Sequence, residues 1–169
     1  MAFLYRGTPN DNIFTVSSGV LSGVSRISGS RIAWQDRSCL YLYDSSKQNT
    51  EVISRFHIDQ SPVLSEEWLL WLDPNSKMVS GYNFNANGSD KDIRAINDFV
   101  AYHGHPGVSL TIAAGGEVAV WEDNRNGNLD IFGFNLTTRQ EVSICTDVGD
   151  QFYPDTDGHT VVWVQHVGG

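Results

Sequence analysis

Short apolar stretches alternate with polar turns along the whole chain, and four of these stretches end in the same way. Each is rich in β-branched or aromatic residues and leads into a tryptophan that is followed, two positions later, by a polar residue. The four stretches are Arg31–Asp36, Leu69–Asp73, Val118–Asp123 and Val161–Gln165. Because they are bounded by Gly, Asn, Asp and Ser, they predict the strands of an antiparallel meander and no long helix.

The spacing of these tryptophans indicates an internal repeat. Positions 34, 71, 121 and 163 are separated by steps of 37, 50 and 42 residues. A four-stranded blade of a β-propeller repeats every ~40–45 residues. We therefore predict an all-β fold, a single β-propeller over 1–169 with four repeats of four antiparallel strands. The predicted blades cover 24–60, 61–107, 108–152, and 153–169 together with 1–23.

Each repeat continues beyond its tryptophan in a similar order. A polar turn leads to a third strand in which aromatic residues alternate with small ones, as in 40–44 and 131–135, and a short fourth strand follows. Crossovers of related sequence, 59–62 and 150–154, then lead to the next repeat. A sheet with two apolar faces cannot fold alone, so we expect the repeats to stack with their tryptophans buried between them.

The two ends of the chain carry complementary parts of a repeat. The fourth repeat stops after its second strand, whereas 3–6 and 12–16 look like a third and a fourth strand. Pairing them would remove open sheet edges. Within one chain this closure makes a ring of four blades, and between two chains it makes a ring of eight. We expect the second arrangement, a homodimer.

The third repeat carries a recognisable motif. Residues 120–131 read Val-Trp-Glu-Asp-Asn-Arg-Asn-Gly-Asn-Leu-Asp-Ile, and Phe134–Thr138 follows as a hairpin. This segment resembles the blade of TolB-like propellers, which typically has Trp-Glu-Asp-x-Arg-x-Gly, then Asp-Ile-Tyr and a Thr-Gly hairpin. The first repeat matches in outline, the second is longer and divergent, and the fourth is half present. The resemblance implies a propeller. It does not carry catalytic residues over to this chain, because the motif is architectural.

The charge of the chain narrows the classes of partner. It has 20 acidic and 11 basic residues, a net charge of −9. Phosphate backbones and anionic membrane surfaces would repel such a protein, which excludes nucleic acid as an expected partner. The sequence has no stretch of ~18 apolar residues, so it predicts no segment that inserts into a membrane. Since 1–6 lack the features of a signal peptide, a cytoplasmic protein and a secreted one that has lost its leader both stay open.

Polar side chains recur in the turns and crossovers that emerge on one face of a propeller. Carboxylates around a funnel would favour a cation, an amine or a basic protein. The same aspartates can instead bond to the backbone of their own turns. The longest crossover adds a histidine pair, and loops often carry function. The predicted ligand-binding residues are Asp36, Asp59, Gln60, Asp73, His103, His105, Asp123, Asp150 and Gln151.

Motifs for metals, cofactors and catalysis are weak. Residues 122–130 superficially resemble a calcium loop but lack the acidic residue at the twelfth position. The pair His103 and His105 has no third ligand at suitable spacing, and no nucleophile elbow is present. We therefore expect no cofactor, no metal and no catalytic residues. The favoured function is a non-catalytic binding module; a lectin-like oligomer and a hydrolase or lyase with a site in the central channel stay as alternatives.

Overall fold

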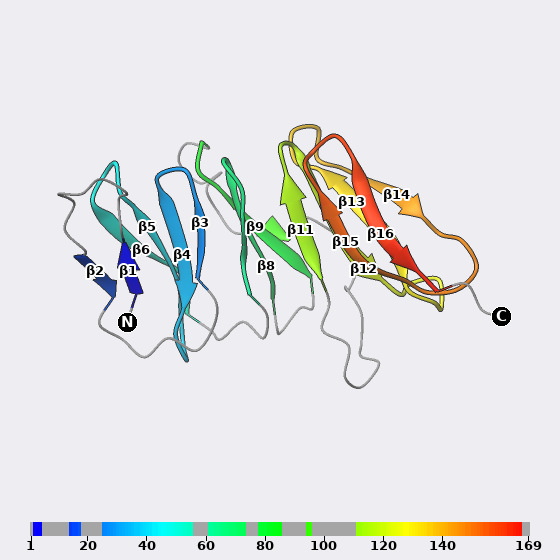
Figure 1. The fold of residues 1–169 in the computed structure, drawn as a ribbon, viewed down its shortest axis with the longest axis horizontal. Helices are drawn as coiled ribbons and strands as arrows, with labels where there is room; N and C mark the ends of the chain where they lie inside the picture. Colours follow the sequence, from blue (N-terminus) through cyan, green and yellow to red (C-terminus); the bar gives the residue numbers. More distant parts are fainter. Residues whose placement is uncertain are drawn as a thin grey trace. The chain divides into compact units, whose positions relative to one another are not determined.

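The computed structural model describes residues 2–4, 14–17, 25–55, 61–73, 78–85, 94–95 and 111–166. Every regular element in these ranges is a β-strand, and all paired strands run antiparallel (Figure 1). The predicted all-β fold is confirmed. The described part contains no helix with the length and apolar character of a membrane span. The chain divides into two compact units, Met1–Pro62 and Val63–Gly169.

In its described residues, the first unit has one sheet of four strands and one of two. The four-stranded sheet has the order β3-β4-β5-β6, and the other sheet pairs β1 with β2. The strands are β1 (Ala2–Leu4), β2 (Phe14–Ser17), β3 (Arg26–Ser28), β4 (Arg31–Gln35), β5 (Leu40–Asp44) and β6 (Asn49–Ser54). Trp34 on β4 lies opposite Tyr41 on β5, and the two rings stack with centroids 5.4 Å apart.

The part of the second unit that the structure describes has two sheets of four strands and one of two. Their orders are β10-β9-β8-β7, β11-β12-β13-β14 and β15-β16. The strands are β7 (Val63–Leu64), β8 (Trp68–Leu72), β9 (Val79–Asn83), β10 (Arg94–Ala95), β11 (Ile112–Gly115), β12 (Val118–Asp123), β13 (Asp130–Asn135), β14 (Gln140–Cys145), β15 (Gln151–Thr156) and β16 (Val161–Gln165). Each predicted tryptophan stretch is the second strand of its sheet.

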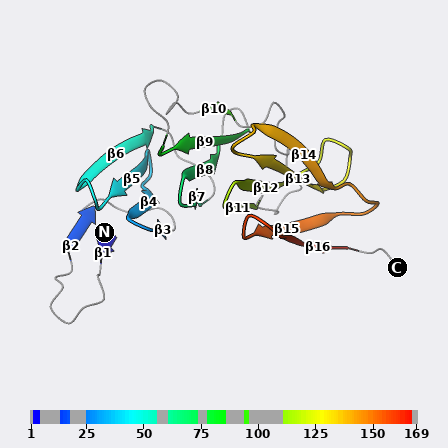
Figure 2. The same cartoon turned by 90° about the horizontal axis from the view of Figure 1, so that it is seen from above.

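The sheets of the second unit stack through apolar faces. Alternate residues of β12 point to opposite sides, and Ala119 and Trp121 belong to one core cluster with Trp68 and Leu70 of β8. Trp121 has no exposed surface. Figure 2 shows the β11–β14 sheet beside the β7–β10 sheet. In this unit the predicted burial of a tryptophan between stacked repeats is confirmed.

The two-stranded β15–β16 sheet packs on the other side of the β11–β14 sheet. A Cβ atom at Gly115, the last residue of β11, would lie 2.5 Å from the carbonyl carbon of Asp157 and 2.7 Å from the nitrogen of Gly158. Only glycine permits this approach of the β15–β16 turn. The turn itself uses a positive φ of 96° at Gly158.

Replacing Trp121 tests the stacked core. Trp121→Ala removes a fully buried ring, so we expect the free energy of unfolding to fall by about 3–5 kcal/mol. Trp121→Phe keeps most of the apolar volume and should cost clearly less. Urea unfolding of both variants measures the difference. An alanine variant as stable as the parent chain would contradict this description of the core.

Candidate functional site

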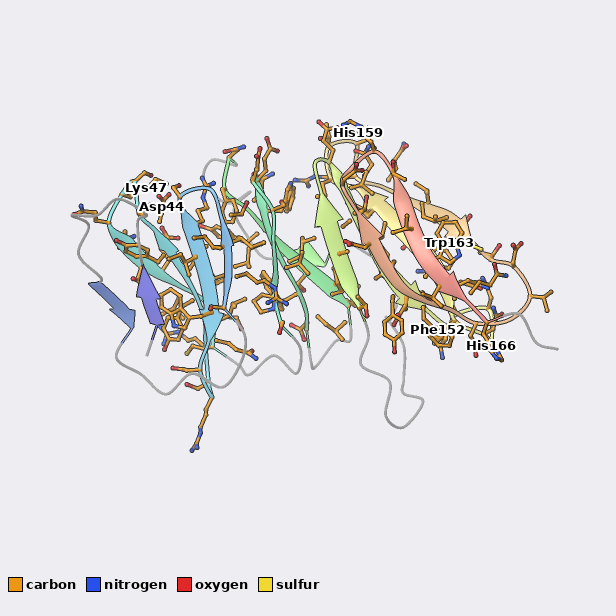
Figure 3. All side chains as sticks on the ribbon, in the orientation of Figure 1. Asp44, Lys47, Phe152, His159, Trp163 and His166 are labelled. Atoms are coloured by element: carbon orange, nitrogen blue, oxygen red, sulfur yellow. The ribbon has the colours of Figure 1, made fainter. Side chains whose placement is uncertain are left out.

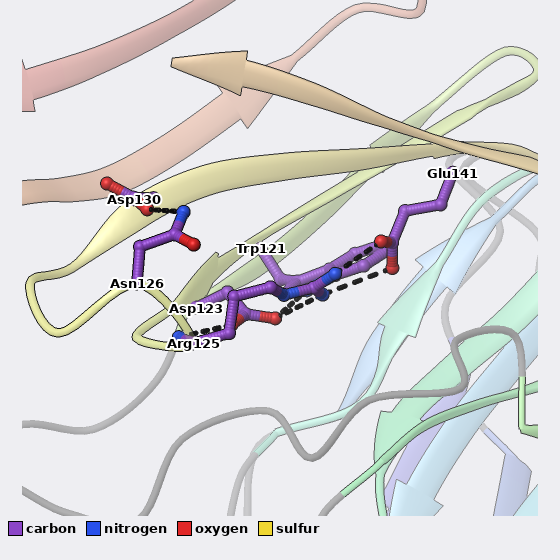
Figure 4. A network of polar contacts seen from close by, with 6 residues as sticks. All are labelled: Trp121, Asp123, Arg125, Asn126, Asp130 and Glu141. Atoms are coloured by element: carbon purple, nitrogen blue, oxygen red, sulfur yellow. Dashed lines mark hydrogen bonds and ion pairs between the residues drawn. The ribbon is translucent and has the colours of Figure 1, made fainter. Parts of the chain in front are cut away.

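The turn after β12 is held by a buried carboxylate. Asp123 has no exposed surface, and its Oδ1 accepts a hydrogen bond of 2.9 Å from the backbone N–H of Arg125. Its Oδ2 pairs with Nη2 of Arg125 at 2.6 Å (Figure 4). The indole Nε1 of Trp121 donates to the same oxygen at 3.4 Å. Asp123 therefore joins the turn to the core tryptophan.

Arg125 reaches a second carboxylate on the far strand of the same sheet. Its Nη1 lies 2.5 Å from Oε1 of Glu141, and its Nη2 donates to Oε2 at 3.2 Å. The guanidinium carbon lies 3.9 Å from the ring centroid of Phe132. Burial acts to lower the pKa of Arg125, but its bonds to Asp123 and Glu141 outweigh burial and raise that pKa. A permanently charged side chain thus ties the turn to β14.

Asp36 has the corresponding place in the first unit and also bonds within its turn. Its Oδ1 accepts from the backbone N–H groups of Ser38 and Cys39, each at 2.8 Å. The Tyr41 hydroxyl donates to its Oδ2 at 2.9 Å. The Ser38 N–H is the main cause that lowers the pKa of Asp36, and the bond to Asp36 raises the pKa of Tyr41 to about 12. This arrangement favours the turn-capping interpretation.

The crossover into β15 is fastened to the turn that precedes β13. Asp150 Oδ1 accepts from the Leu129 N–H at 2.9 Å, and the Gln151 N–H donates to the Leu129 carbonyl at 2.7 Å. The side chain of Gln151 is buried, and its Nε2 donates to the Gly149 carbonyl at 2.9 Å. The structure therefore brings Asp150 and Gln151 next to the β12–β13 turn, at one end of the sheet.

The other predicted site residues are placed less fully. Asp73 is partly buried at the end of β8, and its backbone N–H donates to the Met78 carbonyl at 2.9 Å. Four residues lie outside the described ranges, and their role in ligand binding stays a prediction. They are Asp59, Gln60, His103 and His105.

The calcium-like segment uses its polar side chains for the turn. Asp130 is fully buried, and one of its carboxylate oxygens accepts from the amide nitrogen of Asn126 at 2.6 Å (Figure 4). Its other oxygen accepts from the amide nitrogen of Asn128 at 2.9 Å. Within the described residues, no group of three or more His, Cys, Asp or Glu side chains is arranged to hold a metal ion. These oxygens are thus engaged by neighbouring amides.

A second buried carboxylate lies on the opposite face of β12. Glu122 has no exposed surface. Its Oε1 accepts from the backbone N–H of Tyr153 at 2.6 Å, and its Oε2 accepts from that of Thr111 at 3.2 Å. Burial raises the pKa of Glu122, and the two backbone N–H groups offset this only in part. No ion pair with Glu122 occurs in the described part of the chain.

Tyr153, which Glu122 holds, has an unusual conformation. Its φ is 52°, in the left-handed region that a bulky side chain rarely adopts. Its side chain is not buried, since 61% of the residue surface is exposed. Such strain costs about 1–3 kcal/mol and often occurs at functional positions. Sequence reasoning missed Tyr153, and the available signal was the glutamate inside the apolar stretch of β12.

Loss of the Arg125 side chain tests the buried ion pair. Arg125→Met leaves the Asp123 carboxylate buried without its cation, so we expect the free energy of unfolding to fall by about 3 kcal/mol. Glu141→Gln removes the more exposed charge and keeps a hydrogen-bond acceptor, so it should cost about 1 kcal/mol or less. Denaturant unfolding gives both values. Equal losses of unfolding free energy in the two variants would contradict the conclusion that the buried Asp123 carboxylate depends on Arg125.

The raised pKa of Glu122 predicts a pH dependence of stability. The folded protein holds this proton more tightly than the unfolded chain, whose value is near 4.5. The stability that the protonated Glu122 contributes is fully present below the unfolded pKa, and it is lost as the pH rises through the folded pKa. The stability of the parent chain minus that of Glu122→Gln should therefore decrease from pH 4 towards neutrality. Urea unfolding at a series of pH values measures it, and a constant or growing difference would contradict the prediction.

Comparison with known proteins gives a likeness of fold. No protein-family model matches the chain, and no curated protein matches it either. The crystal structure of TolB from Acinetobacter baumannii superposes with a TM-score of 0.57 and 16% identity over 83% of this chain and 36% of that one. An oligogalacturonate lyase in complex with manganese gives a TM-score of 0.50 and 11% identity over 81% and 43%.

The chain thus spans less than half the length of either solved structure. Both of these proteins are β-propellers. At such low identity the likeness concerns the fold alone, and the chain has an antiparallel β architecture of the propeller type.

Proposed function

We propose that this chain is a TolB-like β-propeller array that serves as a non-catalytic binding module for a cationic partner. The binding surface is the crossover surface, which we define as Asp147, Asp150, Tyr153 and Asp155. The observation that carries the proposal is Tyr153, an exposed ring on a strained backbone. The strained backbone does not serve to bury the Tyr153 side chain in the core, because most of the Tyr153 surface remains in contact with solvent.

The hydrogen bonds around Tyr153 support a recognition role. The fully buried Glu122 accepts a hydrogen bond of 2.6 Å from the backbone N–H of Tyr153. Burying that carboxylate also costs free energy. The neighbouring ring of Phe152 lies with its centroid 6.1 Å from that of Tyr153. Two unfavourable features are thus combined to present one aromatic side chain, which is the arrangement of a preorganised site.

Acidic residues that flank Tyr153 in the sequence support a cationic ligand. Asp147 and Asp155 are exposed on the crossover and on β15, and Asp150 is partly exposed. An aromatic face attracts ammonium and guanidinium groups, and carboxylates around it add to the attraction. The net charge of −9 would also steer a basic peptide or amine towards the protein. Lysine- or arginine-rich segments of a protein are therefore the proposed partner class.

Binding of an oligolysine peptide tests this function. We expect the parent chain to bind oligolysine by calorimetry, more weakly as salt rises, and not to bind oligoglutamate. Tyr153→Gly removes the ring while glycine accepts the positive φ without strain, so the fold is preserved. Affinity should fall about threefold to thirtyfold, the range of a cation–π contact.

A control and two outcomes make the test decisive. Ile27→Ser removes another exposed apolar side chain, in the first unit, and should leave the affinity unchanged. Absence of oligolysine binding, or equal binding by Tyr153→Gly, would overturn the proposal. Binding of neutral sugars on a glycan array in place of oligolysine would favour the lectin-like alternative, since tyrosine rings also pack on sugar rings.

A further inference from the structure

The third repeat differs from the first at two positions that meet in the structure. Its tryptophan is followed by a carboxylate, Glu122, where the first repeat has the neutral Gln35. The crossover behind it is also one residue longer, since 150–154 read Asp-Gln-Phe-Tyr-Pro and 59–62 read Asp-Gln-Ser-Pro. The hydrogen bond between Glu122 and Tyr153 joins these two differences.

The additional residue forms a β-bulge in β15. The pairing of β15 with β16 is in register up to Phe152 and resumes at Asp155. Tyr153 and Pro154 therefore stand together opposite one residue of β16, Trp163, which Figure 3 labels along with Phe152. A bulge leaves its extra residue outside the regular ladder. The Tyr153 N–H accordingly donates to Glu122 of the neighbouring sheet.

The local sequence opposes the backbone conformation found at the bulge. Tyr153 has a φ of 52°, and the residue after it is Pro154. A residue before proline prefers extended backbone with φ of about −120°. A left-handed conformation at a bulky residue costs free energy and is kept only where its surroundings enforce it. The enforcing contact is the 2.6 Å hydrogen bond that Glu122 accepts from the Tyr153 N–H.

Rotation of one peptide plane would remove this strain. Half a turn of the peptide between Phe152 and Tyr153 changes φ of Tyr153 from 52° to about −130°, within the range that a following proline favours. The same rotation replaces the Tyr153 N–H by the Phe152 carbonyl as the group directed at Glu122. A carboxylate accepts hydrogen bonds and donates none, so it holds the N–H and excludes the carbonyl. A protonated carboxyl group has one donor as well, so it can bond to the carbonyl.

We propose that the Phe152–Tyr153 peptide flips when Glu122 takes up a proton from solvent, so that Glu122 controls by pH how Tyr153 is presented. With Glu122 ionised, both of its oxygens accept from backbone N–H groups, as in the structure. With Glu122 protonated, one oxygen still accepts from the Thr111 N–H and the other donates its O–H to the Phe152 carbonyl. The flip itself is independent of ligand binding, and its effect on a cationic partner rests on the proposed function.

The direction of the switch follows from the surroundings of Glu122. Burial raises its pKa, and the N–H groups of Tyr153 and Thr111 lower it. The flip moves one peptide group and leaves the β15–β16 sheet packed, so burial persists while the Tyr153 N–H is lost. The pKa of the flipped form is therefore higher, and acid favours that form. Ile131 of β13 lies opposite Glu122, and among the described residues no charged side chain shifts the pKa of Glu122.

Nuclear magnetic resonance of the parent chain tests the flip without any ligand. The Cα and Cβ chemical shifts of Tyr153 distinguish left-handed from extended backbone, and the carboxyl carbon of Glu122 reports its proton. As the pH falls from neutrality to about 4, we expect Tyr153 to change from left-handed to extended values. The midpoint should coincide with that of the Glu122 carboxyl carbon and lie above the ordinary value of 4.5. Tyr153 shifts that stay the same at every pH, or that change at another midpoint, would overturn the proposal.

Glu122→Gln gives a matched neutral variant. Gln35 is buried at the equivalent position of the first repeat, so an amide is compatible with a strand of this kind. A glutamine amide has one acceptor and one donor group. It therefore satisfies the Thr111 N–H and the flipped Phe152 carbonyl together, but not two N–H groups. We expect extended shifts for Tyr153 at every pH, and left-handed shifts in this variant would contradict the switch.

Tyr153→Gly separates the effect of strain from that of the proton. Glycine accepts a positive φ without steric cost, so the flip no longer relieves strain but still exchanges the hydrogen-bond partners. The transition of the residue 153 amide should move to lower pH by about one unit, which corresponds to strain of this kind. An unchanged midpoint would contradict the role of the strained backbone.

The oligolysine assay distinguishes failure of the switch from failure of the proposed function. If both hold, the parent chain binds oligolysine more weakly below the transition, and Glu122→Gln already binds weakly at neutral pH. The same variant, measured at each pH, accounts for the titration of surface carboxylates. A chain in which Tyr153 flips with Glu122 but which never binds oligolysine contradicts the binding function alone. A chain that binds oligolysine through Tyr153, with unchanged Tyr153 shifts in acid, overturns the switch alone.

Discussion

A β-sheet that is apolar on both faces has to be covered on both sides, and this requirement organises the second unit. The β11–β14 sheet has Trp121 on one face, against Trp68 and Leu70 of the preceding sheet. On its other side Gly115 lets the β15–β16 turn approach at backbone distance. Stacking therefore buries apolar area that a single sheet would leave in water, and the hydrophobic effect favours the array over its separate parts.

Once the sheets stack, the polar groups caught among them must find partners. Asp123 meets this demand with the charge of Arg125, and Glu122 meets it with two backbone N–H groups. The two carboxylates are neighbours in sequence but face opposite sides of β12, because side chains alternate along a strand. One stabilises the turn of its own sheet. The other fixes Tyr153 on the next sheet, so the same packing that forms the core also positions the proposed binding residue.

The exposed parts of the structure are the places where the stacking is incomplete. Tyr153 remains in solvent although its backbone is held tightly, and Val162 and Val164 of β16 are exposed. An exposed aromatic ring on an acidic protein suits a ligand of opposite charge.

The sequence by itself determined the all-β class and the positions of four strands, because the pattern of Trp34, Trp71, Trp121 and Trp163 is local and repeats. It also placed Asp36 and Asp123 in turns, and left open whether they bind a ligand or bond to the backbone of their own turns. The resemblance to TolB-like blades agreed with the propeller type of fold. Only the tertiary structure decided the partners of the buried charges. Arg125 and Glu141 are 16 positions apart, and Glu122 and Tyr153 are 31 apart. The left-handed backbone of Tyr153 was equally invisible, since it depends on which strand lies alongside, and pairing between distant segments leaves no local pattern in the sequence.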